Sequence, residues 1–457
     1  MNRAQGGTVC ARANSHAGSR PIIRTWQGRA AFTFRRDRRD RREAARKRHE
    51  SGPRPPRRCA IATITILPAH KAPAGLWSWG FRPFFLAASI WSALALAVWI
   101  DVYLTGGALP SRFDPLSWHI HEMLLGFVPA AVAGFLLTAI PNWTGHAPVR
   151  GGWLAGLAVL WLLGRIDCLV SARLPLWPAA IVDLAFPFAL CAVAAREIVA
   201  ARNWRNLMMP VPVAVLGIAD LLMYLELAGY DVPAGMEWRL AMTATLALVS
   251  AIGGRIIPAF TRNWLVERGA RTLPAPHGKL DSVALATLHT GLLGWAFFPA
   301  AKPVGVILLA ATALVLWQLG RWRGVGTFAE PLLAILHLGY AWVALGAALL
   351  GASLLTPAVA PSAAIHAFTA GAMGTMVLAV MTRASRGHTG RPLEAGPATI
   401  AIYILITAAG ATRVLAACLV DASIVLLCAS AALWVAGFAL FALSYGPMLV
   451  KSDRHRA

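Results

Sequence analysis

The chain carries a succession of apolar segments, each about 20 residues long, which together fill most of its 457 residues. A helix needs about 20 mostly apolar residues to cross the hydrocarbon core of a membrane. From Arg82 onward we count twelve such segments, separated by short connections that carry Pro, Gly, Asn and the charged residues. We therefore predict an all-α integral membrane protein, a bundle of about twelve transmembrane helices at approximately 83–104, 118–140, 153–171, 175–199, 207–228, 239–259, 280–298, 302–320, 332–355, 361–383, 397–419 and 422–449.

The composition excludes a water-soluble globule. Hydrophobic residues make up 58% of the chain and charged residues 14%, whereas soluble domains carry about 25% charge. The six cysteines form neither a CxxC nor a CxxCH pattern. This absence argues against thiolate zinc sites, cysteine-held iron–sulfur clusters and covalently attached c-type haem.

The formal net charge of +22 belongs mostly to the N-terminus, since residues 1–71 hold 18 Lys and Arg against 4 Asp and Glu. We predict a basic, disordered tail over 1–71, a transmembrane domain over 72–450 and a short basic tail over 451–457. The first tail could attract anionic lipid, lack a function, or be an extension of the gene model, because no Met lies between Met1 and Met123. No nucleic-acid partner is expected, because the body of the chain is apolar.

The basic residues of the connections predict the orientation of the helices. With the N-terminus in the cytoplasm, the inner loops and the C-terminal tail carry sixteen Lys and Arg, and the outer loops carry four. Cytoplasmic loops of membrane proteins are enriched in Lys and Arg. We therefore expect both termini in the cytoplasm.

Several ionisable residues fall inside the predicted helices. At about 1.5 Å per residue, Arg165 and Asp183 lie at the same depth on consecutive antiparallel helices, which predicts that they pair. Asp220 lies near the same layer, and Asp167, Glu226 and Arg413 lie further out. Such charges either fix helix packing or form a proton or ion path, and an Arg–Asp pair alone does not distinguish the two.

Five histidines lie within or at the edge of helices, which is many for a bundle with few other titratable groups. Neutral imidazole binds haem iron and copper, although a single helical histidine is more often a packing residue. These histidines are therefore either packing residues or ligands of non-covalent haem and, as a further cofactor, of copper. The candidate metal ligands are His119, His121, His289, His337 and His366.

The positions of these histidines suggest how they divide. His119 and His121 point about 200° apart on a regular helix, so they serve two sites, or one is a ligand and the other a packing residue. The helical face of His366 carries small residues, which either leave room for a macrocycle or allow close helix packing. Arg413 lies near the level of His366 and is a candidate partner for a haem propionate. The candidate cofactor-binding set is therefore His119, His121, His366 and Arg413.

Six motifs resemble those of the NnrS family, and the resemblance extends over nearly all of residues 76–450. They are WSWGFRPFFL (77–86), WHIHEMLLGF (118–127), LTAIPNWTG (137–145), GGRIIPAFTRNWL (253–265), HLGYAW (337–342) and HAFTAGAMGTMVLAVMTRASRGHTGR (366–391). The basic N-terminal tail departs from the family pattern, which usually begins close to the GFRPFF motif.

The resemblance implies a polytopic bacterial inner-membrane protein that contains haem and copper. It also implies a link to nitric oxide, through denitrification and protection from nitrosative stress, but it specifies neither a reaction nor an electron donor. The matching motifs contain His119, His121, Glu122, Asn142, Trp143, Arg255, Arg262, Asn263, His337, His366, Arg383, His388 and Arg391, and His289 belongs to the same set. From their place at helix ends, we assign Arg262, Arg383 and Arg391 to anchoring at the headgroups.

Three functions remain open at the level of the sequence. The first is a haem and copper membrane protein that acts on, buffers or senses nitric oxide, with an undefined redox reaction. The alternative is a proton-coupled secondary transporter that uses Asp183, Asp220 and Glu226, because twelve helices with both ends inside is a common transporter topology. The third is a non-catalytic membrane scaffold, which leaves the five histidines unexplained.

Overall fold

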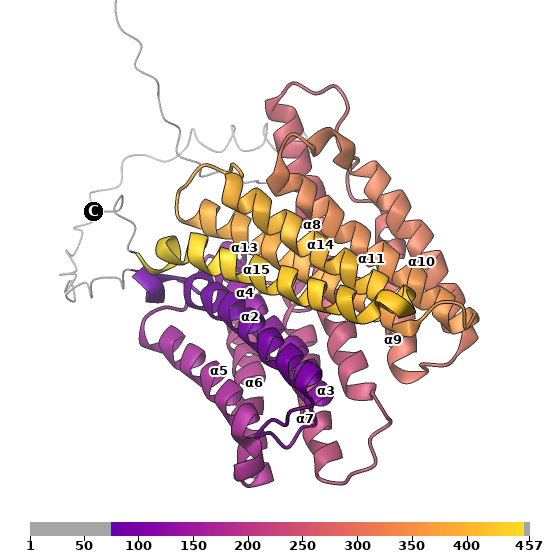
Figure 1. The fold of residues 1–457 in the computed structure, drawn as a ribbon. Coiled ribbons are helices and arrows are strands. Elements are labelled where there is room, and N and C mark those ends of the chain that lie inside the picture. Colours follow the sequence, from indigo (N-terminus) through magenta and orange to yellow (C-terminus); the bar gives the residue numbers. More distant parts are fainter. Residues whose placement is uncertain (1–74, 452–457) are drawn as a thin grey trace, which may run out of the picture. The chain divides into compact units, whose positions relative to one another are not determined.

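The computed structural model describes residues 75–451, and these residues form helices joined by short loops, with no strand among them (Figure 1). The predicted basic tail over 1–71 and nearly all of the C-terminal tail lie outside this range. The first half comprises η1 (Gly75–Ser78), α2 (Phe81–Thr105), α3 (Pro115–His121), η2 (Glu122–Phe127), α4 (Val128–Thr144), α5 (Gly152–Val170), η3 (Ser171–Arg173), α6 (Leu176–Ala200), η4 (Trp204–Asn206) and α7 (Pro210–Leu227).

The second half begins with the longest helix. It comprises α8 (Met236–Glu267), α9 (Lys279–Phe297), α10 (Lys302–Arg321), η5 (Gly324–Thr327), α11 (Pro331–Leu355), α12 (Pro361–His366), η6 (Ala367–Met373), α13 (Gly374–His388), α14 (Pro397–Cys418), η7 (Val420–Ala422) and α15 (Ser423–Val450). All twelve predicted segments are therefore helical, and most of their ends lie within three residues of the prediction.

The structure has eleven candidate membrane spans among residues 75–451, against twelve predicted. Eleven helical segments of residues 75–451 are long and apolar enough to cross a membrane. The predicted span at 280–298 forms α9 but is not among the eleven, because Asp281, His289 and several Ser and Thr residues lower its hydropathy. The orientation of the helices stays a prediction.

The distribution of side chains is that of a protein surrounded by lipid. Large apolar side chains lie on the outside of the bundle, such as Ile181, which is 68% exposed, and Leu443, which is 75% exposed. Arg165 and Asp183, in contrast, are buried inside it. A soluble protein shows the opposite distribution, so the described residues form a multi-pass membrane domain.

The last helix of the domain packs beside the first. Helix α15 contacts both α14 and α2, and α2 contacts α4 (Figure 1). On the other side of the bundle, α8, α9, α10 and α11 pack in sequence. The histidine-bearing segments α3 and α12 lie within this framework, where α3 contacts α2 and α12 contacts α11 and α14.

Two helices contain a π-helical segment directly after a predicted ligand. His121 is the last residue of α3, and the π-helix η2 follows it before the chain continues as α4. His366 is the last residue of α12, and the π-helix η6 follows it before α13. Short π-helical segments occur frequently at functional sites, because the wider turn redirects the neighbouring side chains.

Candidate functional site

Five charged or titratable side chains from four segments meet inside the first half of the bundle. They come from the α3–η2 junction, α5, α6 and α7, and each is at most 3% exposed. We name them the acid–imidazole cluster: His121, Glu122, Arg165, Asp183 and Asp220. Because charged groups are costly to bury, their arrangement depends on how completely they pair.

Both ring nitrogens of His121 face carboxylate oxygens. Nδ1 lies 3.0 Å from Oε1 of Glu122, and Nε2 lies 3.0 Å from Oδ1 of Asp220 and 3.1 Å from Oδ2 of Asp183. An ionised carboxylate only accepts hydrogen bonds, and both nitrogens donate only when the ring is an imidazolium. The cluster therefore holds either an imidazolium or a protonated acid, unless a cation replaces the shared proton.

Arg165 ties the carboxylates of two helices together. One guanidinium nitrogen, Nη1, donates to Oε2 of Glu122 at 2.9 Å, and the other, Nη2, donates to Oδ1 of Asp183. The predicted Arg165–Asp183 pair is thus confirmed, and Asp220 lies in the same layer, as expected. Three carboxylates face one guanidinium and one imidazole, so the cluster has one more acidic group than basic groups.

Further hydrogen bonds fix the carboxylates of the cluster from outside. Nε1 of Trp91 donates to Oε2 of Glu122 at 2.6 Å, and the hydroxyl of Tyr224 donates to Oδ2 of Asp183 at 3.0 Å. Phe113 stacks on the ring of His121, with centroids 5.1 Å apart. Glu122 and Asp183 are therefore each held by donors from different helices, whereas Asp220 faces His121 alone.

Two glycines make room for the cluster. A Cβ atom on Gly126 would lie 2.5 Å from Nη1 of Arg165 and 2.7 Å from Oε2 of Glu122. A Cβ atom on Gly164 would lie 2.7 Å from Oδ1 of Asp183. Real Cβ atoms do not approach other atoms this closely, so both positions must lack a side chain for Arg165 to reach its partners.

Cys168 adds a soft ligand to the edge of the cluster. Its Sγ lies 3.4 Å from Nδ1 of His121, and the ligand atoms of His121, Cys168 and Asp183 lie within 4.8 Å of one another. Thiolate, imidazole and carboxylate together suit a transition metal such as copper or zinc. Arg165 occupies one oxygen of Asp183, however, and would compete with an ion for that carboxylate.

A second site contains His119, His366 and Arg413, which the sequence placed in one set. The three side chains are close enough to interact electrostatically, although they come from α3, α12 and α14. Nδ1 of His366 donates to the backbone oxygen of Ser362 at 2.7 Å, which leaves a lone pair on Nε2 in the neutral ring. Nδ1 of His119 is buried and has no hydrogen-bond partner among residues 75–451.

The orientation of His119 is set by an aromatic ring. Trp99 of α2 stacks on the imidazole with centroids 4.1 Å apart and an interplanar angle of 24°. His119 and His121 therefore face different surroundings, as their spacing predicted. The small residues next to His366 include Gly374, where a Cβ atom would lie 2.5 Å from the ring of Trp434. At Gly374, close helix packing explains the small residue, and room for a macrocycle does not.

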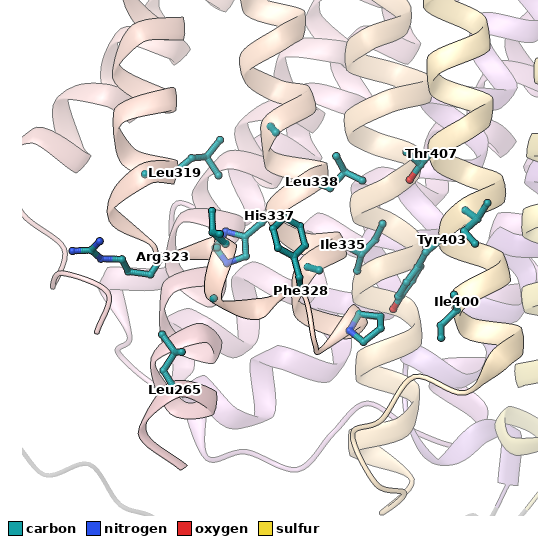
Figure 2. A pocket seen from close by; sticks show the side chains of 18 of the residues that line it. Leu265, Leu319, Arg323, Phe328, Ile335, His337, Leu338, Ile400, Tyr403 and Thr407 are labelled. Atoms are coloured by element: carbon teal, nitrogen blue, oxygen red, sulfur yellow. The ribbon is translucent and has the colours of Figure 1, made fainter. Parts of the chain in front are cut away.

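The remaining two helical histidines lie apart from both sites. Nε2 of His289 is 2.8 Å from the hydroxyl of Ser250, which is a packing arrangement between α8 and α9. Nε2 of His337 is 2.9 Å from the hydroxyl of Thr261, and the same side chain lines a groove of about 1120 Å³. Figure 2 shows His337 of α11 on one side of this groove and Tyr403 of α14 on the other.

Sequence reasoning did not assign Trp91, Cys168 or Tyr224 to a site. For two of them a signal exists, since Cys168 follows Arg165 by three positions and Tyr224 follows Asp220 by four, which places each on the same helical face as a charged residue. Trp91 carries no such signal. It lies on α2 and reaches Glu122 only because α2 packs against η2.

A sequence model of the family described as NnrS protein matches residues 75–452, which is more than four fifths of the chain. The chain belongs to the NnrS family. No curated protein shows significant sequence similarity to it. The matched region of this NnrS protein contains every residue of the acid–imidazole cluster and of the His119–His366–Arg413 site.

Proposed function

We propose that this NnrS protein is a haem- and copper-containing protein of the bacterial inner membrane that binds and converts, buffers or senses nitric oxide, in nitric oxide metabolism or protection from nitrosative stress. Family membership supports the link to nitric oxide. The observation that carries the proposal is the pair of imidazoles at His119 and His366. The two come from distant parts of the chain and have nitrogens that no side chain of residues 75–451 satisfies.

The residues present fit a metal. Haem iron and copper both take neutral imidazole nitrogens, and a histidine ligand commonly donates its other N–H to a backbone carbonyl, as His366 does to Ser362. His119 and His366 would hold the metal, and Arg413 would pair with an anionic group such as a haem propionate. A metal bound there would supply a coordination site for nitric oxide and redox chemistry.

The surrounding chain prepares this site in two ways. Stacking on Trp99 fixes the plane of the His119 ring, so little rotamer entropy is lost when a ligand binds. Two residues later, His121 is held by three carboxylates, which fixes the end of α3 in the bundle. The acid–imidazole cluster thereby acts as a positioning element for His119.

The groove beside His337 offers a second location for a macrocycle. Its volume of about 1120 Å³ exceeds that of many ligand pockets, which span roughly 300–1,000 Å³. Neither His119 nor His366 lines this groove or the two smaller cavities described below. Haem and copper should therefore be quantified separately in variants of each histidine.

Metal analysis of the purified protein tests the proposal. We expect iron, haem and copper in the detergent-solubilised protein and a spectral change on adding nitric oxide. His119→Ala and His366→Ala should each lose at least one of these metals, whereas His277→Ala, in an exposed loop, should keep all of them. A folded wild-type protein that contains neither metal and shows no nitric oxide spectrum would disprove the proposal.

One observation supports the transporter alternative, and another argues against it. Asp183 and Asp220 meet in a buried cluster with an excess carboxylate, as a proton-coupling site requires. Glu226, the third predicted coupling residue, does not belong to that cluster. Uptake measured in proteoliposomes under a proton gradient, with Asp220→Asn as the comparison, decides between transport and a purely structural cluster.

A further inference from the structure

A cavity of about 420 Å³ opens between α4, α8 and α13, apart from both histidine sites. A smaller cavity of about 70 Å³ continues it, because Phe85, Phe135, Ile252 and Val380 line both. We name the two together the α4–α8–α13 cleft. It lies between helices of the first and second halves of the domain, where ligand sites of membrane proteins often occur.

One end of the cleft is polar and cationic. Asn142 at the end of α4, Arg255 of α8, and Arg383 and His388 near the end of α13 line the larger cavity. The smaller cavity contains no charged residue and only one hydroxyl, that of Thr245. The cleft therefore runs from a basic mouth into an apolar shaft.

The two arginines at the mouth lack a carboxylate partner. Within residues 75–451 neither forms a salt bridge: Nη1 of Arg255 donates to Oδ1 of Asn206 at 3.3 Å, and the guanidinium of Arg383 stacks on Phe260 at 4.2 Å. Glu330 is near enough to Arg383 to interact electrostatically, but the two form no ion pair. Most guanidinium donors at the mouth remain available, and their planar geometry matches a carboxylate or a phosphate.

We propose that the α4–α8–α13 cleft binds an anionic amphiphile. Its carboxylate or phosphate head would lie at Arg255 and Arg383, and its hydrocarbon tail would extend past Phe85 and Ile252 into the shaft. Both parts of the cleft are needed for this assignment, since a small polar anion would leave the shaft empty and a neutral hydrocarbon would leave both guanidinium groups without a counter-charge.

The structure separates these two arginines from the other basic helix ends. The sequence assigned Arg383 to headgroup anchoring together with Arg262 and Arg391. Arg262 and Arg391 are exposed and do not line the cleft, although each lies in the same motif as one of the two cleft arginines. Anchoring still accounts for Arg262 and Arg391, and they serve as matched controls.

Ligand binding to the full chain in detergent tests the inference. After delipidation, native mass spectrometry would measure binding of phosphatidylglycerol, of phosphatidylcholine with the same acyl chains, and of oleate. We expect at least one anionic probe to bind at least tenfold more tightly than phosphatidylcholine. Binding of phosphatidylglycerol alone identifies a membrane lipid as the ligand, and binding of oleate alone identifies a free fatty anion.

Substitutions locate the binding. Arg255→Gln and Arg383→Gln should each weaken binding of the anionic probe about tenfold or more, while Arg262→Gln and Arg391→Gln should change it less than twofold. Ile252→Phe, at the junction of the two cavities, should weaken the binding of long-chain probes but not that of an eight-carbon anion. Metal content should not change in any of these variants. The amphiphile proposal and the metal proposal can therefore fail independently of each other.

Three outcomes would overturn the inference. The first is equal binding of anionic and neutral lipids, and the second is an equal effect of the cleft and control arginines. The third is loss of haem from Arg255→Gln and Arg383→Gln without loss of bound amphiphile, which would assign the arginines to a cofactor. Circular dichroism and gel filtration of each variant would show that the protein remains folded.

Discussion

Arg165 and Asp183 form a buried ion pair between the consecutive helices α5 and α6, and Arg165 also binds Glu122 of η2 at 2.9 Å. One guanidinium group therefore connects three segments of the first half of the bundle. His121 binds the same two carboxylates from the other side. The end of α3, which carries His119, is fixed through this network.

Removing the guanidinium should destabilise the domain. Arg165→Met leaves three buried carboxylates with only one basic partner, and breaking a buried ion pair from one side costs about 3–5 kcal/mol. We expect a large fall in the midpoint of thermal unfolding, measured in detergent by tryptophan fluorescence. Arg196→Met is the matched control, because Arg196 is 80% exposed and pairs with Glu197 at the surface. Equal midpoints for the two variants would contradict a central role for the cluster.

The glycines beside the cluster give a second prediction. Gly126→Ala and Gly164→Ala place a methyl group within 2.5–2.7 Å of charged atoms, so Arg165 or its partners must move. Overpacking of this kind costs about 1–3 kcal/mol, and loss of an ion pair would add to it. Gly156→Ala on the same helix as Gly164 meets no atom within 4 Å and should be neutral or stabilising, because alanine favours helices by about 1 kcal/mol. Unfolding midpoints of the three variants check this order.

The helices themselves were predictable, because the length of an apolar segment is set by the thickness of the membrane. Two departures from the prediction have physical reasons. Helix α8 continues to Glu267, well past the predicted end at 259. The prediction follows the apolar segment alone, and the last turns of the helix, which include Arg262 and Asn263, lie beyond that segment. Helix α9 forms where the prediction places it, but its polar residues leave its hydropathy below that of the eleven candidate spans.

The sites were predictable only in part. Depth along the helix gave the Arg165–Asp183 pair, since the two helices follow one another directly in the chain. Depth does not tell which helices are lateral neighbours, so the approach of His119 to His366, and of Trp91 to Glu122, needed the structure. The π-helical segments η2 and η6 also have no sequence signal that we recognise, and they change the direction of the side chains that follow each histidine.

A third prediction concerns pH and the start of α3. Oδ1 of Asp114 accepts hydrogen bonds from the backbone N–H groups of Leu116 and Ser117 at 2.9 and 3.1 Å. Partial burial raises the pKa of this carboxyl group, but hydrogen bonds from Ser117 and Leu116 outweigh it, and the pKa lies below its usual value. The ionised cap therefore stabilises the fold fully above about pH 4, and this contribution is lost as the pH falls through the lowered pKa.

Two variants separate the charge of this cap from its geometry. Asp114→Asn keeps an N-cap acceptor but not the charge. The stability of this variant should therefore lack the decrease at low pH that protonation of Asp114 causes in the wild type. Asp114→Ala should lose about 1 kcal/mol at neutral pH. Unfolding midpoints measured between about pH 3 and pH 7 test both expectations. If Asp114→Asn and the wild type showed the same dependence of the unfolding midpoint on pH, a contribution from this carboxylate would be ruled out.

The last prediction assigns different roles to the two histidines of α3: His121 stabilises the fold, and His119 binds metal. His121→Ala removes the imidazole that faces Glu122, Asp183 and Asp220, so buried carboxylates lose their donor and the unfolding midpoint should fall sharply. His119→Ala removes only the stacking on Trp99, worth about 0.5–1.5 kcal/mol, because no hydrogen bond to its Nδ1 is lost. It should therefore stay folded but lose metal. Unfolding midpoints and metal content, measured on the same preparations, distinguish the two roles. The assignment would be reversed if the His121→Ala protein were stable but poor in metal while the His119→Ala protein kept its metal.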